Sequence, residues 1–268
     1  MALIRIQDVS VCYSERTVLD RVCLDIREGD FVCVLGQTGC GKTTLLRLVL
    51  GSERPQCGRI LIDGAEHHRP DRTRGYVPQK YSLFPDRTVL DNITFGPEVT
   101  EFGLFGRFTP AFYRRRKQLR EEAYDYLRRI GLRESDARKY PDQLSGGMQQ
   151  RVAIAQALMN KPRILLMDEA FSALDPGTRR DMQELLKQLW RMTGTTILFV
   201  THNTDEALRL GTRIIVLARP ALDQGARVML DLPVPQPCCE EAIPTLTRRL
   251  ERVSQNAGLE QDLASVAG

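Results

Sequence analysis

The chain has 268 residues, of which 42% are hydrophobic, enough to bury a substantial core in one large or two closely joined domains. Its 38 Lys and Arg residues against 34 Asp and Glu residues leave a net charge of +4, too small to indicate nucleic acid as the main partner. Composition therefore favours a globular protein in which any charged binding surface is confined to a small part of the chain.

The sequence carries no signal for export or for membrane insertion. Its N-terminal residues alternate like a strand and lack the charged-then-apolar pattern of a signal peptide. The longest apolar runs, such as Ile214–Ala218, fall far short of the roughly 20 residues that cross a bilayer. The seven cysteines form no C-x-x-C pair, so they indicate reduced thiols rather than a zinc site or a disulfide framework. We expect a cytosolic chain that reaches a membrane only through partners.

The first part of the chain reads as strands around one helix. Period-2 patterns predict strands at 3–13 and 18–27, and a continuous apolar run predicts a doubly buried strand at 31–35. A helix from Lys42 to Leu50, ended by Gly51, follows a Gly-rich loop. Two further strands are expected at 59–63 and 74–78.

The remainder combines a helical region with a βαβ rhythm. The pattern is helical from about 88 to 160, most clearly at Leu119–Ile130. Three strands then alternate with two helices, as in a parallel sheet. The strands are expected at 164–168, 196–201 and 213–217, and the helices at 176–192 and 204–210.

The Gly-rich loop is a full match to the P-loop spacing. Gly36-Gln37-Thr38-Gly39-Cys40-Gly41-Lys42-Thr43 follows a predicted strand and opens a predicted helix. Glycine backbone N–H groups and the helix N-terminus would bind the phosphates. Thr44, the next residue of the helix, is also expected to contact the nucleotide. Lys42 should reach the β- and γ-phosphates, and the Thr43 hydroxyl should bind Mg²⁺. We therefore expect a nucleoside triphosphate and Mg²⁺ here; an ordinary tight turn would not need all these residues.

Two carboxylates follow the apolar run Ile164–Met167. Ligands of open α/β sheets bind at the carboxyl ends of the strands, where Asp168 and Glu169 are expected. Asp168 suits a Mg²⁺ ligand and Glu169, one residue later, suits the group that polarises an attacking water. Alone this pattern would equally fit a solvated turn; beside a P-loop it favours hydrolysis.

With these motifs and Leu144-Ser145-Gly146-Gly147-Met148-Gln149-Gln150-Arg151, residues 3–220 resemble the ATP-binding subunits of ABC transporters. The resemblance implies a P-loop NTPase fold of class α/β: a RecA-like, mostly parallel sheet with flanking helices, an antiparallel β subdomain and an inserted helical subdomain at about 88–160. It also implies that Ser145, Gly146 and Gly147 open a helix against the γ-phosphate held by a second subunit. Ser145 would cap the helix 148–159 in either case.

Four weaker positions match the same family pattern. Tyr13 falls where an aromatic ring stacks on adenine, and Gln79, after Tyr76-Val77-Pro78, where a glutamine contacts Mg²⁺ or water. Ser172–Asp175 matches the loop that contacts the partner's P-loop, and His202 the histidine that contacts the γ-phosphate. Taken singly, each residue would fit packing or polar structure. One departure is Ala170, where a proline is expected, which should loosen the backbone without removing a ligand.

The resemblance implies that activity needs two copies. Lys42 and Glu169 of one subunit and Ser145 and Gly147 of the other would enclose each ATP, so that hydrolysis releases the dimer. The implied partners are a second ATP-binding subunit, two transmembrane permease subunits and, indirectly, an extracytoplasmic substrate-binding protein. The implied location is the cytoplasmic face of the inner membrane.

The region expected to face membrane partners is basic. Residues 101–140 contain 11 Lys and Arg residues against 6 acids, a local excess that exceeds the charge of the whole chain. Arg114–Lys117 is a candidate contact for a permease or anionic lipid, whereas a solvated helix face explains it equally well.

The residues around the motifs, such as Ala173–Arg179, are similar to the bacterial importer branch for nitrate, sulfonates, taurine or bicarbonate. Three alternatives stay open: an ABC ATPase of DNA repair or chromosome structure, a cytosolic ABC ATPase of translation or cofactor assembly, and a phosphotransferase. The first is disfavoured because Lys42 and Ser145 are only roughly 100 positions apart with no sustained heptads between them. The third has no use for the Ser145 motif.

The C-terminal tail, 221–268, has no assigned role. Leu232–Pro237 is too rich in proline for a sheet centre or a helix, and a short amphipathic helix through Ile243, Leu246 and Leu250 should follow. Packing on the core, contact with a second subunit and regulation all remain open for it.

Overall fold

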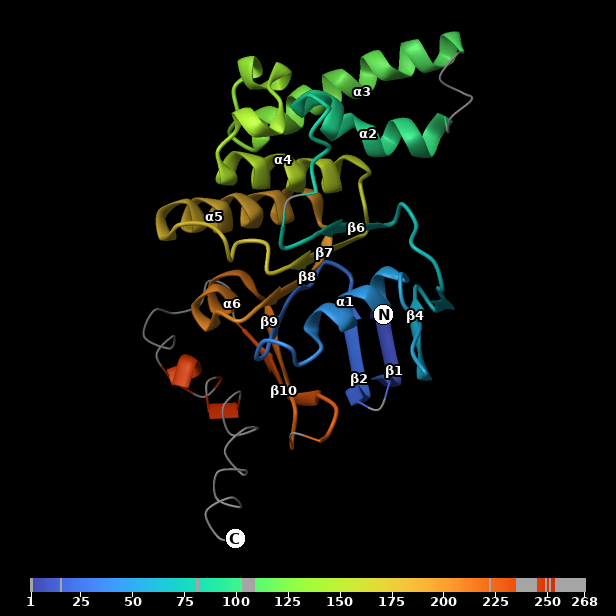
Figure 1. Ribbon diagram of the computed structural model, residues 1–268, viewed down its shortest axis with the longest axis vertical. Helices are drawn as coiled ribbons and strands as arrows, with labels where there is room; N and C mark the ends of the chain where they lie inside the picture. The colour runs from blue at the N-terminus through green and yellow to red at the C-terminus, as the bar shows by residue number, and fades with distance from the viewer. Residues whose placement is uncertain are drawn as a thin grey trace, which may run out of the picture. The chain divides into compact units, whose positions relative to one another are not determined.

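The computed structural model (Figure 1) describes residues 2–14, 16–80, 82–102, 109–221, 223–234, 245–248, 250 and 252–253. The chain divides into two units. The core unit takes its residues from Met1–Asp71, Leu166–Glu169 and Gly194–Gly268. The helical unit takes its residues from Arg72–Leu165 and Ala170–Thr193.

One sheet of the core unit is antiparallel and has the strand order β2-β1-β4-β5. Its long strands pair because their apolar residues alternate, which leaves Ile4, Ile6 and Ile26 buried on one face. Both long predicted strands are confirmed, extended by one or two residues. The bounds are β1 Ala2–Tyr13, β2 Arg16–Arg27, β4 Cys57–Ile62 and β5 Ala65–Glu66.

The second sheet of the core unit is mostly parallel. β3 (Phe31–Leu35) lies between β8 (Thr196–Thr201) and β9 (Arg213–Ala218), parallel to both. Every residue of β3 and β8 is buried, as their continuous apolar runs predict. The carboxyl ends of these strands therefore share one edge, which positions the loops that follow them.

The sequence patterns gave no strand beyond residue 219, yet β10 (Arg227–Pro233) pairs antiparallel with β9 at the edge of this sheet. Pro233 ends the strand, and an edge strand tolerates a residue without an N–H donor. The prediction that 232–237 forms neither sheet centre nor helix holds for the described residues Leu232–Val234; the rest of that stretch lies outside them.

Two helices of the core unit follow the predicted bounds. α1 is Lys42–Leu50, and Gly51 ends it with a φ of 83°, a left-handed conformation that suits glycine. α6 is Thr204–Leu210, capped by Asn203, whose side chain accepts from the Glu206 N–H.

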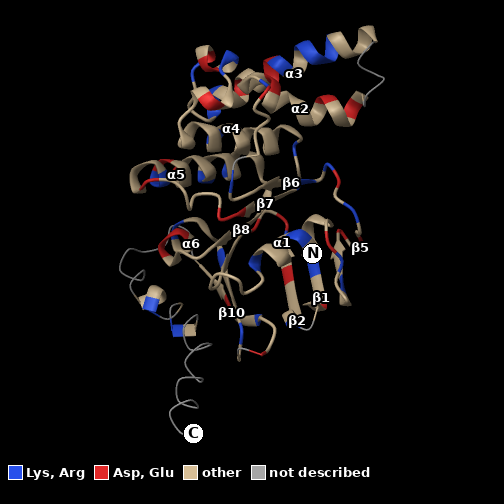
Figure 2. Cartoon of the chain, in the orientation of Figure 1, with Lys and Arg blue, Asp and Glu red and all other residues tan. Residues whose placement is uncertain are grey.

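Among the described residues, the helical unit includes β6, the start of β7 and the α-helices α2, α3, α4 and α5. The helix predicted at Leu119–Ile130 is longer at its N-terminus, because Thr109 caps it and Pro110 fits its first turn. Figure 2 shows blue Lys and Arg segments along this helix, α3. The bounds are β6 Arg74–Val77, α2 Val89–Phe102, α3 Pro110–Arg129, α4 Gly146–Met159, β7 Ile164–Asp168 and α5 Pro176–Thr193, with 3-10 turns at Glu134–Arg138 and Pro141–Gln143.

Within the described ranges, none of the helices combines the length and apolarity that a membrane span requires.

Candidate functional site

The P-loop of the core unit is shaped for an anion. Gly39 and Gly41 have φ values of 79° and 103°, which a side chain would strain. At Gly36 an added Cβ would lie 2.3 Å from the Leu217 carbonyl oxygen, so only glycine fits. No side chain caps α1, which leaves the N–H groups of its first turn for a ligand.

Lys42 folds back over this loop. Its Nζ donates to the carbonyl oxygens of Gly36 at 2.8 Å and Gln37 at 2.9 Å, and lies 3.7 Å from Glu169 Oε1. The side chain is only 5% exposed. The ammonium group is thus held at the loop, where it can exchange carbonyl partners for phosphate oxygens.

Cys40 is one of the buried residues of the loop, and burial raises the pKa of its thiol. Arg219 makes a contact that no sequence motif predicts: its guanidinium donates to the Gly39 carbonyl at 3.0 Å. A cation 180 positions away in the sequence therefore holds the loop.

Thr43 and Asp168 meet, as the sequence predicts for a pair of Mg²⁺ ligands. The Thr43 hydroxyl donates to Asp168 Oδ2 at 2.8 Å, and Asp168 is buried. A hydroxyl and a carboxylate are hard oxygen ligands, and Mg²⁺ usually takes one or two protein oxygens beside phosphates and water. Nowhere in the described ranges do three His, Cys, Asp or Glu side chains gather as a metal cluster. Because a hydroxyl and one carboxylate leave the other Mg²⁺ positions to phosphate and water oxygens, the Thr43–Asp168 pair fits an ion that is bound together with nucleotide.

Glu169 is positioned by an unusual backbone. Its φ is 45°, in the left-handed region, and its N–H donates to the Val200 carbonyl of β8 at 2.9 Å. The carboxylate lies between two cationic or potentially cationic groups, since Oε2 is 3.3 Å from His202 Nδ1. Lys42, Glu169 and His202 thus form one chain of polar contacts at the carboxyl edge of the parallel sheet.

Tyr13 lies at the end of β1 and is 44% exposed, as a ring that stacks on a ligand must be. Its hydroxyl donates to Glu53 Oε1. Burial, followed by this hydrogen bond, raises the pKa of the phenol. Glu53 is a residue that the sequence analysis missed, and it fixes the ring without using its face.

The other predicted site residues belong to the helical unit. The Gln79 side-chain amide donates to Ser172 Oγ at 3.4 Å. Asp175 accepts from the N–H groups of Gly177 and Thr178, and the contact with Thr178 lowers the pKa of its carboxyl group. These bonds order the loop 172–175 at the start of α5.

Ser145 caps α4 as predicted, although the helix starts at Gly146 rather than at residue 148. Its Oγ accepts from the Met148 N–H at 3.3 Å. Gly147 is constrained, because an added Cβ would lie 2.6 Å from Thr178 Cγ2. Ser145 and Gly147 open onto a cavity of about 460 Å³. Its charged lining residues are Arg133, Lys139, Arg151, Asp136 and Asp181. The α4 N-terminus thus faces a cavity of mixed charge, in which the helix N–H groups are the feature that suits an anion.

Residues 19–172, more than half of the chain, match the family model described as ABC transporter. An uncharacterized ABC transporter ATP-binding protein of Methanocaldococcus jannaschii is 46% identical over 203 residues, which cover 75% of this chain and 71% of that protein. The spermidine/putrescine import ATP-binding protein PotA of Mannheimia succiniciproducens is 40% identical over 83% of this chain, but this match spans only 57% of the PotA length. Among solved structures, a dimeric post-hydrolysis state of an ATP-binding cassette bound to ADP and phosphate aligns with a TM-score of 0.69 and 33% identity, covering 87% of this chain and 99% of the other.

Proposed function

Because the chain belongs to the ABC transporter family of ATP-binding proteins, we propose that it is the ATP-hydrolysing subunit of an importer assembled from separate subunits. It is a P-loop ATPase of the ABC cassette fold. The observation that carries the proposal is that the chain holds two helix N-termini suited to phosphate. One, α1, has the hydrolytic residues beside it; the other, α4, belongs to the other unit and opens on Ser145.

At the first site the side chains and N–H groups of this chain bind the nucleotide and orient the attacking water. The P-loop N–H groups and Lys42 hold the phosphates, and Tyr13 stacks on the base. Thr43 and Asp168 would hold Mg²⁺, which when bound neutralises phosphate charge. Glu169 accepts a proton from the attacking water, and His202, 3.3 Å from its carboxylate, orients Glu169 and the phosphate end.

The second site completes the first in a second copy of the chain. Ser145 and Gly147 bring a helix N-terminus to the phosphate but no general base. In a symmetric dimer, one subunit supplies the P-loop and Glu169 of each site, and the other supplies the Ser145 motif. Mixing Lys42→Ala with Ser145→Arg tests this. Each variant alone should be inactive, while a 1:1 mixture should recover about a quarter of normal activity, since half of the dimers hold one intact site. A mixture as inactive as its components would reject the shared site.

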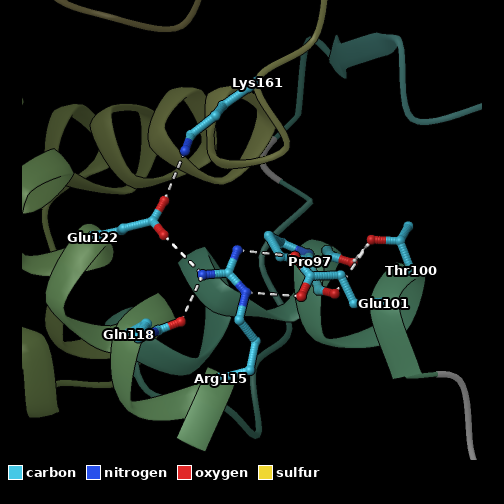
Figure 3. Close-up of polar contacts among 8 residues, drawn as sticks. Pro97, Thr100, Glu101, Arg115, Gln118, Glu122 and Lys161 are labelled. Atoms are coloured by element: carbon cyan, nitrogen blue, oxygen red, sulfur yellow. Dashed lines mark hydrogen bonds and ion pairs between the residues drawn. The ribbon is translucent and has the colours of Figure 1, made fainter. Parts of the chain in front are cut away.

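The basic stretch of α3 divides into an internal and an exposed half. Arg115 bonds both oxygens of Glu101, at 2.8 and 3.0 Å, and Glu122 at 3.0 Å (Figure 3). Arg116 lies 3.2 Å from Glu98. These two arginines are occupied within the helical unit and are poor candidates for a partner contact.

Arg114 and Lys117 are exposed, and the described residues provide neither of them with an ion pair. Tyr113, 64% exposed, lies next to them on the helix surface. We propose that this exposed α3 face, Tyr113, Arg114 and Lys117, contacts the permease. Arg114→Gln with Lys117→Gln should lower recovery of the assembled complex, most at low salt. Equal recovery of variant and wild type at every salt concentration would reject the contact.

Two cargo classes compete. The sequence motifs resemble importers of nitrate, sulfonates, taurine or bicarbonate, whereas relatives at 40–41% identity are named for spermidine and putrescine. Polyamines are therefore the first cargo to test, and small anions the second. Transport assays with the reconstituted complex separate them, because the ATPase of a complete importer should rise only with its own cargo.

The membrane assignment has its own test. At the cytoplasmic face, the chain should co-purify in detergent with two permease subunits, and the ATPase should respond to a binding protein. Recovery with ribosomes or an assembly scaffold instead would favour the nontransport alternative. The domain assignment, with residues 3–220 as the ATP-binding domain and about 88–160 as its insert, remains part of this proposal.

A further inference from the structure

A leucine of the C-terminal region lies against the P-loop in the core unit. Residues 245–248, 250 and 252–253 are helical, and Leu250 is only 1% exposed. Leu250 lines a cavity of about 240 Å³. The other lining residues are Leu35, Gly36, Gln37, Thr38, His202 and Thr204.

This neighbour does not suit the chemistry of the cavity. Gly36, Gln37 and Thr38 belong to the phosphate loop, and His202 lies 3.3 Å from the Glu169 carboxylate. An anion needs N–H donors, cations or water, and an isobutyl side chain offers none of these. Docked Leu250 and a second subunit closing on the phosphates therefore compete for the space beside His202.

The contacts of the docked segment are weak enough for it to be released. The Thr247 hydroxyl is buried, and none of the described residues provides it with a hydrogen bond. Such an unsatisfied group opposes docking. Full burial of one leucine shifts an equilibrium by a factor on the order of 10 to 100, which a tightly bound partner can overcome. Arg248 and Arg252 remain exposed and add no burial.

We propose that the C-terminal segment around Leu250, described at residues 245–248, 250 and 252–253, is an internal inhibitor of the ATPase. With no second subunit closed on the site, Leu250 forms one wall of the cavity beside the P-loop and His202; when ATP and a partner's Ser145 motif close the site, the segment leaves. By opposing closure of two chains on ATP, the inhibitor restrains futile hydrolysis by chains that are not assembled with a permease. This inference rests on the shared site proposed above.

Three full-length variants test the contact by ATPase rate. Leu250→Glu should expel the segment and raise the rate of the isolated chain at least about threefold at low protein concentration. Thr247→Val removes the unsatisfied hydroxyl at nearly constant shape and should lower the rate about twofold or more. Leu246→Glu, the same change on a half-buried residue outside the cavity, is the matched control and should have the smaller effect. If Leu250→Glu and Leu246→Glu change the ATPase rate equally, or if no variant changes it, the proposal is overturned.

Hydrogen exchange separates this inference from the proposed function. In the full-length Glu169→Gln chain, amides of 245–253 should exchange faster when ATP and Mg²⁺ are added, in samples whose dimer content is measured in parallel. Dimers with unchanged or slower exchange would show that the segment stays packed, which overturns the inhibitor. No dimer, together with tighter ATP binding by Leu250→Glu, would instead sink the shared site while supporting the competition at the P-loop.

Discussion

Arg115 offers the sharpest test of how the basic stretch is used. Its guanidinium makes a two-pronged contact with Glu101 and a third contact with Glu122, which also bonds Lys161 at 2.9 Å (Figure 3). The Arg115 side chain is 30% exposed, so solvent screens part of each ion pair. We expect Arg115→Met to cost about 1.5 kcal/mol of unfolding free energy, which corresponds to a loss of about 3–6 °C in Tm.

Arg114→Met is the matched control, since Arg114 is exposed and has no ion pair among the described residues. It should change Tm by less than about 1 °C. Calorimetry or urea unfolding of both variants measures the difference, and 0.5 M salt should narrow it. If the two variants are equally stable, Arg115 does not hold the helical unit together, and the division of the stretch into internal and exposed halves is wrong.

The same network predicts a pH dependence. The hydrogen bond from Lys161, with a further contribution from Arg115, lowers the pKa of Glu122. A carboxyl group whose pKa is lower when folded stabilises the protein above its unfolded value, about 4.3, and loses this effect as pH falls through the folded value. Glu122→Gln should therefore destabilise the chain at pH 7 and make little difference at acidic pH, where Glu122 is protonated in both the folded and the unfolded chain. Equal destabilisation at both pH values would contradict this contribution.

Three further predictions concern the nucleotide site. Glu169→Gln should retain ATP binding, measured by equilibrium dialysis, and lower the steady-state ATPase rate by about 10²-fold or more, whereas Lys42→Ala should lose binding itself. Thr43→Val should bind nucleotide with little dependence on Mg²⁺ and hydrolyse it slowly; an undiminished Mg²⁺ response would place the ion elsewhere. Tyr13→Phe should bind ATP normally and Tyr13→Ala about tenfold more weakly, because the ring face and not the hydroxyl meets the base; equal losses in titration calorimetry would reject stacking.

The strands and loops around the P-loop follow from sequence because their causes are local. β3 and the interior of β8, Ile197–Val200, are continuous apolar runs, as expected for strands buried on both faces, and the geometry of the loop requires its glycines. β10 escaped prediction because three apolar residues, Val228–Leu230, break its alternation and because Pro233 argues against a strand, although an edge strand tolerates proline. The early start of α3 could have been found, since Thr109 followed by Pro110 is a local cap signal.

What sequence could not give are the contacts between distant positions. Glu101 and Arg115 are 14 positions apart, on two helices, so the charge pattern alone leaves Arg115 free for a partner. Arg219 and Gly39 are separated by 180 positions, and neither lies in a motif that would pair them. The amphipathic spacing of Leu250 predicts a helix but not which surface covers it. Such pairings depend on tertiary packing, which the periodicity of a sequence does not report.

The central claim is that two copies of the chain share each nucleotide, and the oligomeric state of the stalled enzyme tests it most directly. Sedimentation of the Glu169→Gln chain should show dimers when ATP and Mg²⁺ are present. It should show monomers when nucleotide is absent. Ser145→Glu in the same background should still bind ATP but remain monomeric, because a carboxylate at the α4 N-terminus repels the partner's phosphate. Monomers of the stalled enzyme in saturating ATP, or undiminished dimers of the Ser145→Glu variant, would contradict the shared site.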